Sequence, residues 1–169
     1  MTVRTLPPPR STSEQQAPLL RSRDAADLGR AGRIPRILLV SRDLACLRWM
    51  EAGLSEIGLE SITRATEVAS AVMALRQRTF GLLITSADLC GPDGGLTLVN
   101  WLRSRGPVQN RGVPAVVLTA SCDQAWITRA GDNGVTLALR YPLILREFQL
   151  RMERLIEVRQ LAASAIHGE

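Results

Sequence analysis

The sequence predicts a doubly wound α/β domain, in which helices cover both faces of a parallel sheet. Short apolar runs alternate with helical patterns from Pro35 to the end of the chain, and several of these runs are continuous rather than mixed with polar residues. Continuous runs are typical of strands that are buried on both faces. With 169 residues and 46% apolar residues, the chain is long enough for one such domain.

The first half of the domain contains three expected strands and two expected helices. Residues 36–40 form a continuous run, as a central strand does, and the helix after it carries Leu47, Met50, Leu54 and Ile57 at spacings of three and four before Gly58 ends it. An edge strand is expected at residues 59–63. The next helix spans residues 67–77, with an apolar stripe of Val68, Ala71, Val72 and Leu75. Residues 82–85 make the third strand.

The second half repeats the alternation. A third helix presents Leu98, Val99 and Leu102 to the core, and residues 113–119 form the fourth strand. A short helix at residues 123–130 leads to a fifth strand at residues 135–139. Tyr141 and Pro142 then lead into a last helix that reaches about residue 163. Five strands and five helices are therefore expected.

The chain is expected to divide into an arm and one domain. Residues 1–34 contain PPP, STSEQQ and scattered arginines with little apolar periodicity, which predicts a disordered N-terminal arm. Residues 35–165 make the domain, including an extended last helix. Too few residues follow this helix for a DNA-binding or enzymatic output domain, so we expect a stand-alone protein.

Composition excludes several classes of function. No apolar run is long enough to span a membrane and no signal peptide is recognisable, so a cytoplasmic protein without membrane contact is expected. Three cysteines without CxxC spacing favour neither a zinc site nor a disulfide framework. The net charge is +5, but the arm carries much of the excess and the domain is nearly balanced. No nucleic-acid partner is expected.

Five stretches together resemble a known family. They are ILLVSRD at residues 37–43, FGLLITS at 80–86, GGLTLVNWLR at 94–103, VPAVVLTAS at 113–121 and RYPL at 140–143. In this order and spacing, the chain resembles the receiver domain of response regulators, the CheY-like superfamily of bacterial two-component and phosphorelay signalling. The resemblance implies a flavodoxin-like (βα)5 fold with strand order 2-1-3-4-5 and a site at the carboxyl ends of the central strands.

The resemblance also implies a phosphorylation site, and this sequence departs from it. Active receivers hold Mg²⁺ with two acids after the first strand and an aspartate after the third, and that aspartate takes the phosphoryl group. Here the acid pair falls on Ser41 and Arg42, and the acceptor position is Ser86. The lysine before a cis proline becomes Tyr141 with Pro142, and the whole chain contains no lysine. Only the switch position, Thr119, is retained. A degenerate pseudo-receiver without cofactor, metal or enzymatic activity is therefore expected.

Asp88 leaves an alternative open. Moving the alignment gap makes DLCGPDGGL resemble the family loop, and a bulge in the strand could turn Asp88 inward as a phosphoryl acceptor with Mg²⁺. The other reading is that Asp88 pairs with Arg42 as a permanent substitute for the contact between phosphate and cation. Cys90 and Cys122 lie on loops at the same edge and are read as incidental thiols in preference to a redox pair.

Two surfaces are candidate interaction sites. Trp49 lies opposite the apolar stripe of the first helix, where receivers commonly dock a histidine kinase or phosphotransfer protein; packing against its own helix is the other reading. The last helix carries a second apolar stripe that includes Leu150, Val158 and Leu161. A second stripe predicts a second neighbour, and a homodimer through this helix is expected.

Three functional hypotheses follow. The first is a stand-alone pseudo-receiver that acts by phosphorylation-independent protein–protein interaction. The second is a working phospho-receiver that uses Asp88. The third is a flavodoxin-like sensor that binds a small ligand at the vacated site, and it is weaker because the loops offer no glycine-rich phosphate cradle of the usual spacing.

Overall fold

A parallel sheet of five strands forms the centre of the protein. The computed structural model describes residues 35–166, with side chains described up to Arg159, so the predicted arm at residues 1–34 lies outside it. The strands are β1 (Ile37–Val40), β2 (Ile62–Ala65), β3 (Leu82–Ser86), β4 (Ala115–Thr119) and β5 (Leu137–Arg140). They are arranged in the order β2-β1-β3-β4-β5, and all neighbouring pairs are parallel. The predicted fold class and strand order are confirmed.

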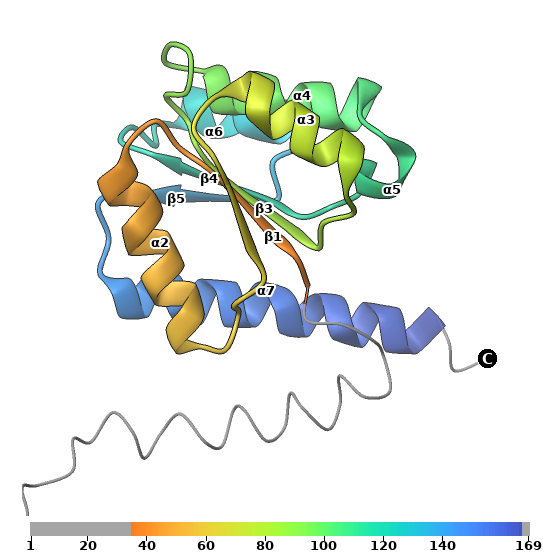
Figure 1. Cartoon of the computed structure of the whole chain (residues 1–169). Helices are drawn as coiled ribbons and strands as arrows, with labels where there is room; N and C mark the ends of the chain where they lie inside the picture. Colours follow the sequence, from red (N-terminus) through yellow and green to blue (C-terminus); the bar gives the residue numbers. More distant parts are fainter. Residues whose placement is uncertain (1–34, 167–169) are drawn as a thin grey trace, which may run out of the picture.

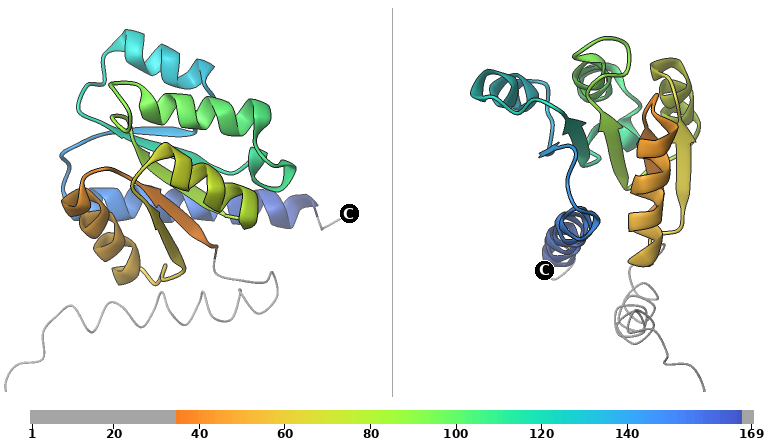
Figure 2. Two further views of the ribbon diagram at one scale, coloured as in Figure 1. Left: turned by 45° about the horizontal axis from the view of Figure 1, so that its top comes forward. Right: turned by 90° about the vertical axis from the view of Figure 1, so that its left-hand side faces the viewer.

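Helices cover both faces of this sheet (Figures 1 and 2). On one face lie α2 (Leu44–Glu56) and α7 (Leu145–Ile166). On the other lie α3 (Val68–Gln77), α4 (Gly94–Arg105) and α6 (Gln124–Asp132), with the single turn α5 (Val108–Arg111) beside them. None of the described helices combines the length and apolar character that crossing a bilayer requires.

The two faces bury separate apolar clusters, and β1 contributes to both. Leu38 and Val40 pack under α3 and α4, while Ile37 and Leu39 pack under α2 and α7. This alternation follows from the strand geometry, in which successive side chains point to opposite faces. It explains why the strand reads as one continuous apolar run: neither face of it meets water.

The predicted second and fifth strands begin two to three residues too early for one shared reason. After α2, Gly58 has φ 86°, its N–H bonds to the carbonyl of Ser55, and the N–H of Leu59 bonds to that of Leu54. The same pair of bonds follows α6, where Gly134 has φ 84° and Val135 donates to Ala130. In this Schellman motif the apolar residue after the glycine belongs to the helix cap rather than to the strand.

Three further boundaries differ from the prediction. The single turn α5 was not expected, and β4 begins at Ala115 because the N–H of Val113 still bonds to the Asn110 carbonyl in the turn. The last helix extends to Ile166 rather than to about residue 163.

Asn110 of α5 is fully buried and ties this turn to the connection between α3 and β3. Its side chain forms hydrogen bonds with backbone groups of Leu75, Arg78 and Phe80.

Candidate functional site

The carboxyl ends of β1, β3 and β4 bring three of the predicted site residues to one edge of the sheet. Ser41 follows β1, Ser86 ends β3 and Thr119 ends β4. The hydroxyl of Ser86 donates a hydrogen bond of 2.8 Å to Oγ of Ser41, which also accepts the N–H of Asp43 at 3.2 Å. Both serines are buried, with 6% and 1% of their surface exposed. Two neutral hydroxyls therefore bond to each other where the family resemblance implies two carboxylates.

Cys46 completes this buried cluster. Its Sγ lies 4.0 Å from Oγ of Ser86, and the side chain is almost fully buried on the first turns of α2. Burial raises the pKa of the Cys46 thiol, and the hydrogen bonds to Ser86 and Ser41 offset only part of this effect. The thiol is therefore a weaker acid than a free cysteine, which argues against a reactive thiolate here.

Arg42 does not pair with Asp88, so this hypothesis is wrong. The guanidinium of Arg42 is exposed and reaches only the carbonyl of Leu89, at 3.4 Å. No ion pair joins the two side chains among the described residues. The neighbouring Asp43 serves as the N-cap of α2, because its carboxylate accepts the N–H of Ala45 at 2.8 Å.

Asp88 points to solvent rather than into the site. The strand ends at Ser86, so alternation along the strand does not continue to Asp88; the side chains of Ala87 and Leu89 are buried and that of Asp88 is exposed. The loop is held by its backbone, since the N–H of Gly95 bonds to the Ala87 carbonyl at 2.8 Å. A Cβ at Gly95 would collide with the carbonyl oxygen of Ser86, so this close approach requires glycine.

The hydroxyl of Thr119 forms hydrogen bonds within its own loop. It donates to the carbonyl of Ser121 at 2.9 Å and accepts the N–H of the same residue at 3.2 Å. Thr119 is buried, with 5% of its surface exposed. The retained hydroxyl therefore stabilises the turn after β4 and makes no hydrogen bond to Ser86 among the described residues.

Tyr141 occupies the lysine position with its ring against Trp49. The peptide bond from Tyr141 to Pro142 is cis, as the resemblance implies. The ring centroids of Tyr141 and Trp49 lie 5.5 Å apart in an edge-on arrangement, and Trp49 also contacts Phe148 at 4.8 Å. Burial raises the pKa of the Tyr141 phenol, with smaller contributions from Cys46 and Asp43. The cation of the family site is thus replaced by a neutral aromatic contact.

The side chains at this edge do not fit the Mg²⁺ ion that the family resemblance implies. A magnesium site needs carboxylates and other hard oxygen ligands, whereas Ser41 and Ser86 offer neutral hydroxyls and Arg42 adds a fixed positive charge. Among the residues that the structure describes, no group of three or more acidic, histidine or cysteine side chains could hold a metal.

The predicted interaction residues have different environments. Trp49 is half-buried and packs on Tyr141 and on Phe148 of α7, so it contacts the last helix and the segment before it rather than its own helix surface. Leu150 and Val158 of α7 are 49% and 61% exposed. The side chain of Leu161 lies outside the described part of the helix. Whether these side chains bind a partner stays a prediction.

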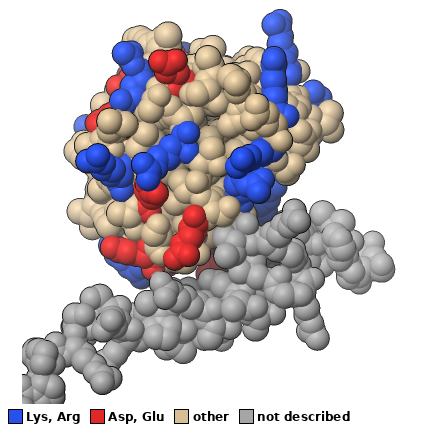
Figure 3. Space-filling view, viewed as in Figure 1, with Lys and Arg blue, Asp and Glu red and all other residues tan. Residues whose placement is uncertain are grey.

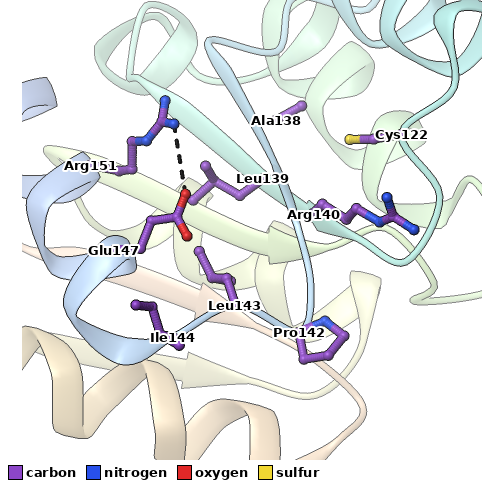
Figure 4. A pocket seen from close by; sticks show the side chains of 9 residues that line it. All are labelled: Cys122, Ala138, Leu139, Arg140, Pro142, Leu143, Ile144, Glu147 and Arg151. Carbon is purple, nitrogen blue, oxygen red and sulfur yellow. Dashed lines mark ion pairs between the residues drawn. The ribbon is translucent and has the colours of Figure 1, made fainter.

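An open pocket of about 820 Å³ lies between β5 and the start of α7, away from the serine pair (Figure 4). Its lining includes Ala138 and Arg140 of β5, Ile144 before α7, and the ion pair between Glu147 and Arg151, whose closest atoms are 3.8 Å apart. The small-ligand hypothesis gains no support around Ser86, where protein side chains pack against each other.

Cys90 and Cys122 are both free thiols, the first exposed and the second half-buried. Whether they are incidental thiols or a redox pair stays a prediction.

Cys46 is the site residue that the sequence analysis missed. Only its position three residues after the N-cap Asp43 indicates that it faces inward with Leu47 and Met50. The contact between Trp49 and Tyr141 was also missed, because it joins residues far apart in the sequence.

Comparisons with known proteins bear on the fold. No protein-family model and no curated protein matches the sequence. Among solved structures, the chemotaxis response regulator CheY4 of Vibrio cholerae is 17% identical, with a TM-score of 0.65 over 72% of this chain and 98% of that chain. A CheY-like receiver domain protein of Methanospirillum hungatei is 16% identical, with a TM-score of 0.67 over 77% of this chain and 99% of that chain.

A third solved structure carries the metal that is in question here. It is the receiver domain of a sensor histidine kinase of Pseudomonas aeruginosa, with a magnesium ion coordinated in its active-site cleft. It is 23% identical, with a TM-score of 0.62 over 72% of this chain and 97% of that chain. At these identities the likeness shows the fold: residues 35–166 have the fold of CheY-like receiver domains of response regulators.

Proposed function

We propose that the protein is a pseudo-receiver: a bacterial signalling protein with the receiver fold that takes up no phosphoryl group and acts by binding other proteins in the cytoplasm. One observation carries this proposal. The hydroxyls of Ser41 and Ser86 bond to each other in the buried position where a receiver needs its metal ligand and its acceptor carboxylate.

The chemistry of phosphoryl transfer explains why this substitution matters. The transfer needs a nucleophile, a cation that bridges the oxygens, and a positive charge to stabilise the product. Among the described residues, the Ser86 hydroxyl has only the Ser41 hydroxyl and the Cys46 thiol as hydrogen-bond partners, so no general base activates it. Tyr141 supplies no charge at the lysine position, and the chain contains no lysine to replace it.

Protein binding is the function that such a fold retains. We propose that α7 forms a homodimer contact through its outer stripe, which is supported by the exposure of Leu150 and Val158. A histidine kinase or phosphotransfer protein is proposed as a second partner at α2. A Leu150→Arg variant is expected to lower the dimer fraction in sedimentation velocity, while Leu44→Arg, which changes an equally exposed residue on α2, leaves it unchanged.

The decisive experiment measures phosphoryl uptake from acetyl phosphate by intact mass, with and without Mg²⁺. No mass gain is expected for the wild-type chain. The positive control is a variant in which the residue types of active receivers are restored at four positions, by Ser41→Asp, Arg42→Asp, Ser86→Asp and Tyr141→Lys. A Mg²⁺-dependent gain in the wild type that Asp88→Ala abolishes would overturn the proposal in favour of a working receiver.

A further inference from the structure

Six exposed arginines gather at the amino end of the sheet, opposite the edge that carries the serine pair. They lie just before β1, in or just after α3, and in α4, α5 and α7, and we call them the arginine edge: Arg36, Arg76, Arg78, Arg105, Arg111 and Arg159. Figure 3 shows part of this group as blue side chains over the ends of α3, α4 and α5 at the right of the view, with no red among them.

Hydrogen bonds between the segments show that these arginines are neighbours. Arg36 donates to the carbonyl of Thr79 at 3.4 Å, and Arg159 donates to that of Gly81 at 2.6 Å. Both therefore converge on the loop that follows Arg78. The buried Asn110 bonds to the carbonyl of Arg78 at 2.6 Å, which brings Arg111 to the same corner.

Arg105 and Arg76 extend this cluster along α4 and α3. Arg111 donates to the carbonyl of Gly106 at 2.8 Å and so ties α5 to the end of α4, next to Arg105. The guanidinium of Arg76 lies 5.8 Å from the ring centroid of Trp101, on the side where α3 meets α4. Five segments of the chain thus contribute cations to one continuous edge.

The arginine edge has no matching carboxylates. Among the described residues, four ion pairs are formed within 4.0 Å, and none of them includes an arginine of this edge. Any carboxylate that pairs with these arginines therefore lies outside the described part of the chain.

Helix dipoles explain part of this arrangement. The last turns of α3, α4 and α5 end here, and cations near helix C-termini are favourable by a few tenths of a kcal/mol. This electrostatic effect does not require the guanidinium to use its five N–H donors, so it leaves them available to a partner. The side chains of Arg78 and Arg105 form no hydrogen bond among the described residues, so their donors face solvent.

The chemistry of the edge indicates the class of partner. Guanidinium groups match planar carboxylates and phosphates with two parallel hydrogen bonds. A single-stranded nucleic acid would also need aromatic side chains for base stacking, and no Trp, Tyr or Phe is among the exposed large apolar residues of the described chain. A membrane surface would need a band of apolar side chains beside the cations, whereas the exposed large apolar residues near this edge are single ones on three separate helices: Met73 of α3, Val108 of α5 and Val158 of α7.

We propose that the arginine edge docks an acidic segment of a partner protein, rich in aspartate and glutamate. This contact lies at the opposite end of the sheet from the serine pair, so it is independent of whether the protein takes up a phosphoryl group.

The test measures binding of a fluorescein-labelled peptide of alternating Asp and Glu to the full chain by fluorescence anisotropy, at low and at physiological salt. The test variant carries Arg76→Gln, Arg78→Gln and Arg105→Gln, none of which removes a hydrogen bond of the structure. The control carries Arg48→Gln, Arg140→Gln and Arg154→Gln, three exposed arginines elsewhere that also form no ion pair within the described part of the chain. Both variants lose the same charge, and both keep residues 1–34.

The Kd of the test variant is expected to rise at least about tenfold and that of the control less than about threefold, with binding weaker at the higher salt. If the triple variant does not fold, as judged by circular dichroism, the single changes Arg78→Gln and Arg105→Gln are measured in its place. Equal losses in test and control would overturn the proposal, because they would reflect net charge alone. Tighter, arginine-edge-dependent binding of duplex DNA or of vesicles containing phosphatidylglycerol would also overturn it.

Discussion

The hydrogen bond between Ser86 and Ser41 can be measured with a double-mutant cycle. Ser86→Ala removes the donor of a 2.8 Å bond between two buried hydroxyls, and Ser41→Ala removes its acceptor together with the bond from the Asp43 N–H. A buried polar group that loses its partner costs about 1–3 kcal/mol. Each single change is therefore expected to lower the free energy of unfolding by about 1–2 kcal/mol, which corresponds to roughly 4 °C in Tm per kcal/mol for a domain of this size.

The double variant separates this bond from other effects. Once both hydroxyls are gone, neither is left unsatisfied, so the double change is expected to cost about 1 kcal/mol less than the sum of the single changes. Urea unfolding followed by tryptophan fluorescence gives the free energies. Ser104→Ala, which removes an exposed hydroxyl of α4, is the control and is expected within about 0.5 kcal/mol of the wild type. Additivity of the two changes within about 0.3 kcal/mol would refute the view that the serines form one bonded unit.

Three further perturbations test the surrounding structure. Asn110→Ala leaves three backbone groups without their side-chain partners and is expected to destabilise the domain by about 3 kcal/mol or more in urea unfolding; a loss below about 1 kcal/mol would contradict this. Gly95→Ala forces a methyl group against the Ser86 carbonyl and is expected to lower Tm markedly, whereas Gly112→Ala, with nothing within 4 Å, is expected to leave it nearly unchanged. Folding raises the pKa of Cys46 above its ordinary value of 9.0, so the buried neutral thiol contributes to stability below that pH, and this contribution is lost as the pH rises. The wild type should therefore lose more stability than Cys46→Ala between about pH 8 and pH 10. A thiol reagent should label the exposed Cys90 first and Cys46 only after unfolding.

The fold could be predicted because its signals are local. Each central strand is buried on both faces and so forms a continuous apolar run, and each helix carries its stripe at spacings of three and four. The strand boundaries were less accurate at Leu59 and Val135, because an apolar residue after a glycine fits a helix cap as well as a strand. The order of the strands came from the family resemblance, since periodicity alone does not say which strands are neighbours.

The candidate site could be predicted only in part, for a different reason. The positions of Ser41, Ser86 and Thr119 came from the family resemblance, and the structure places them at or just after strand ends. The contacts of their side chains did not, because they depend on where the backbone turns. One alternative had a bulge in the strand turn Asp88 inward, but β3 ends at Ser86 and the next residues follow a loop held by Gly95. The predicted ion pair between Arg42 and Asp88 was wrong for the same reason, because Asp88 lies on this loop and is exposed.

The side chains at the carboxyl edge of the sheet make contacts that, under the proposed function, leave little for a phosphoryl group to change. In a switch, a ligand must bind one of two states better than the other, and it shifts the equilibrium only by that difference. Here the Thr119 hydroxyl is already bonded to its own loop, and Tyr141 is packed on Trp49. Ala138 on β5 presents no aromatic ring that could change position. We therefore propose that this protein is regulated by differential binding of partners at its outer surfaces, and the arginine edge and the outer stripe of α7 are the two surfaces where such binding can be tested separately.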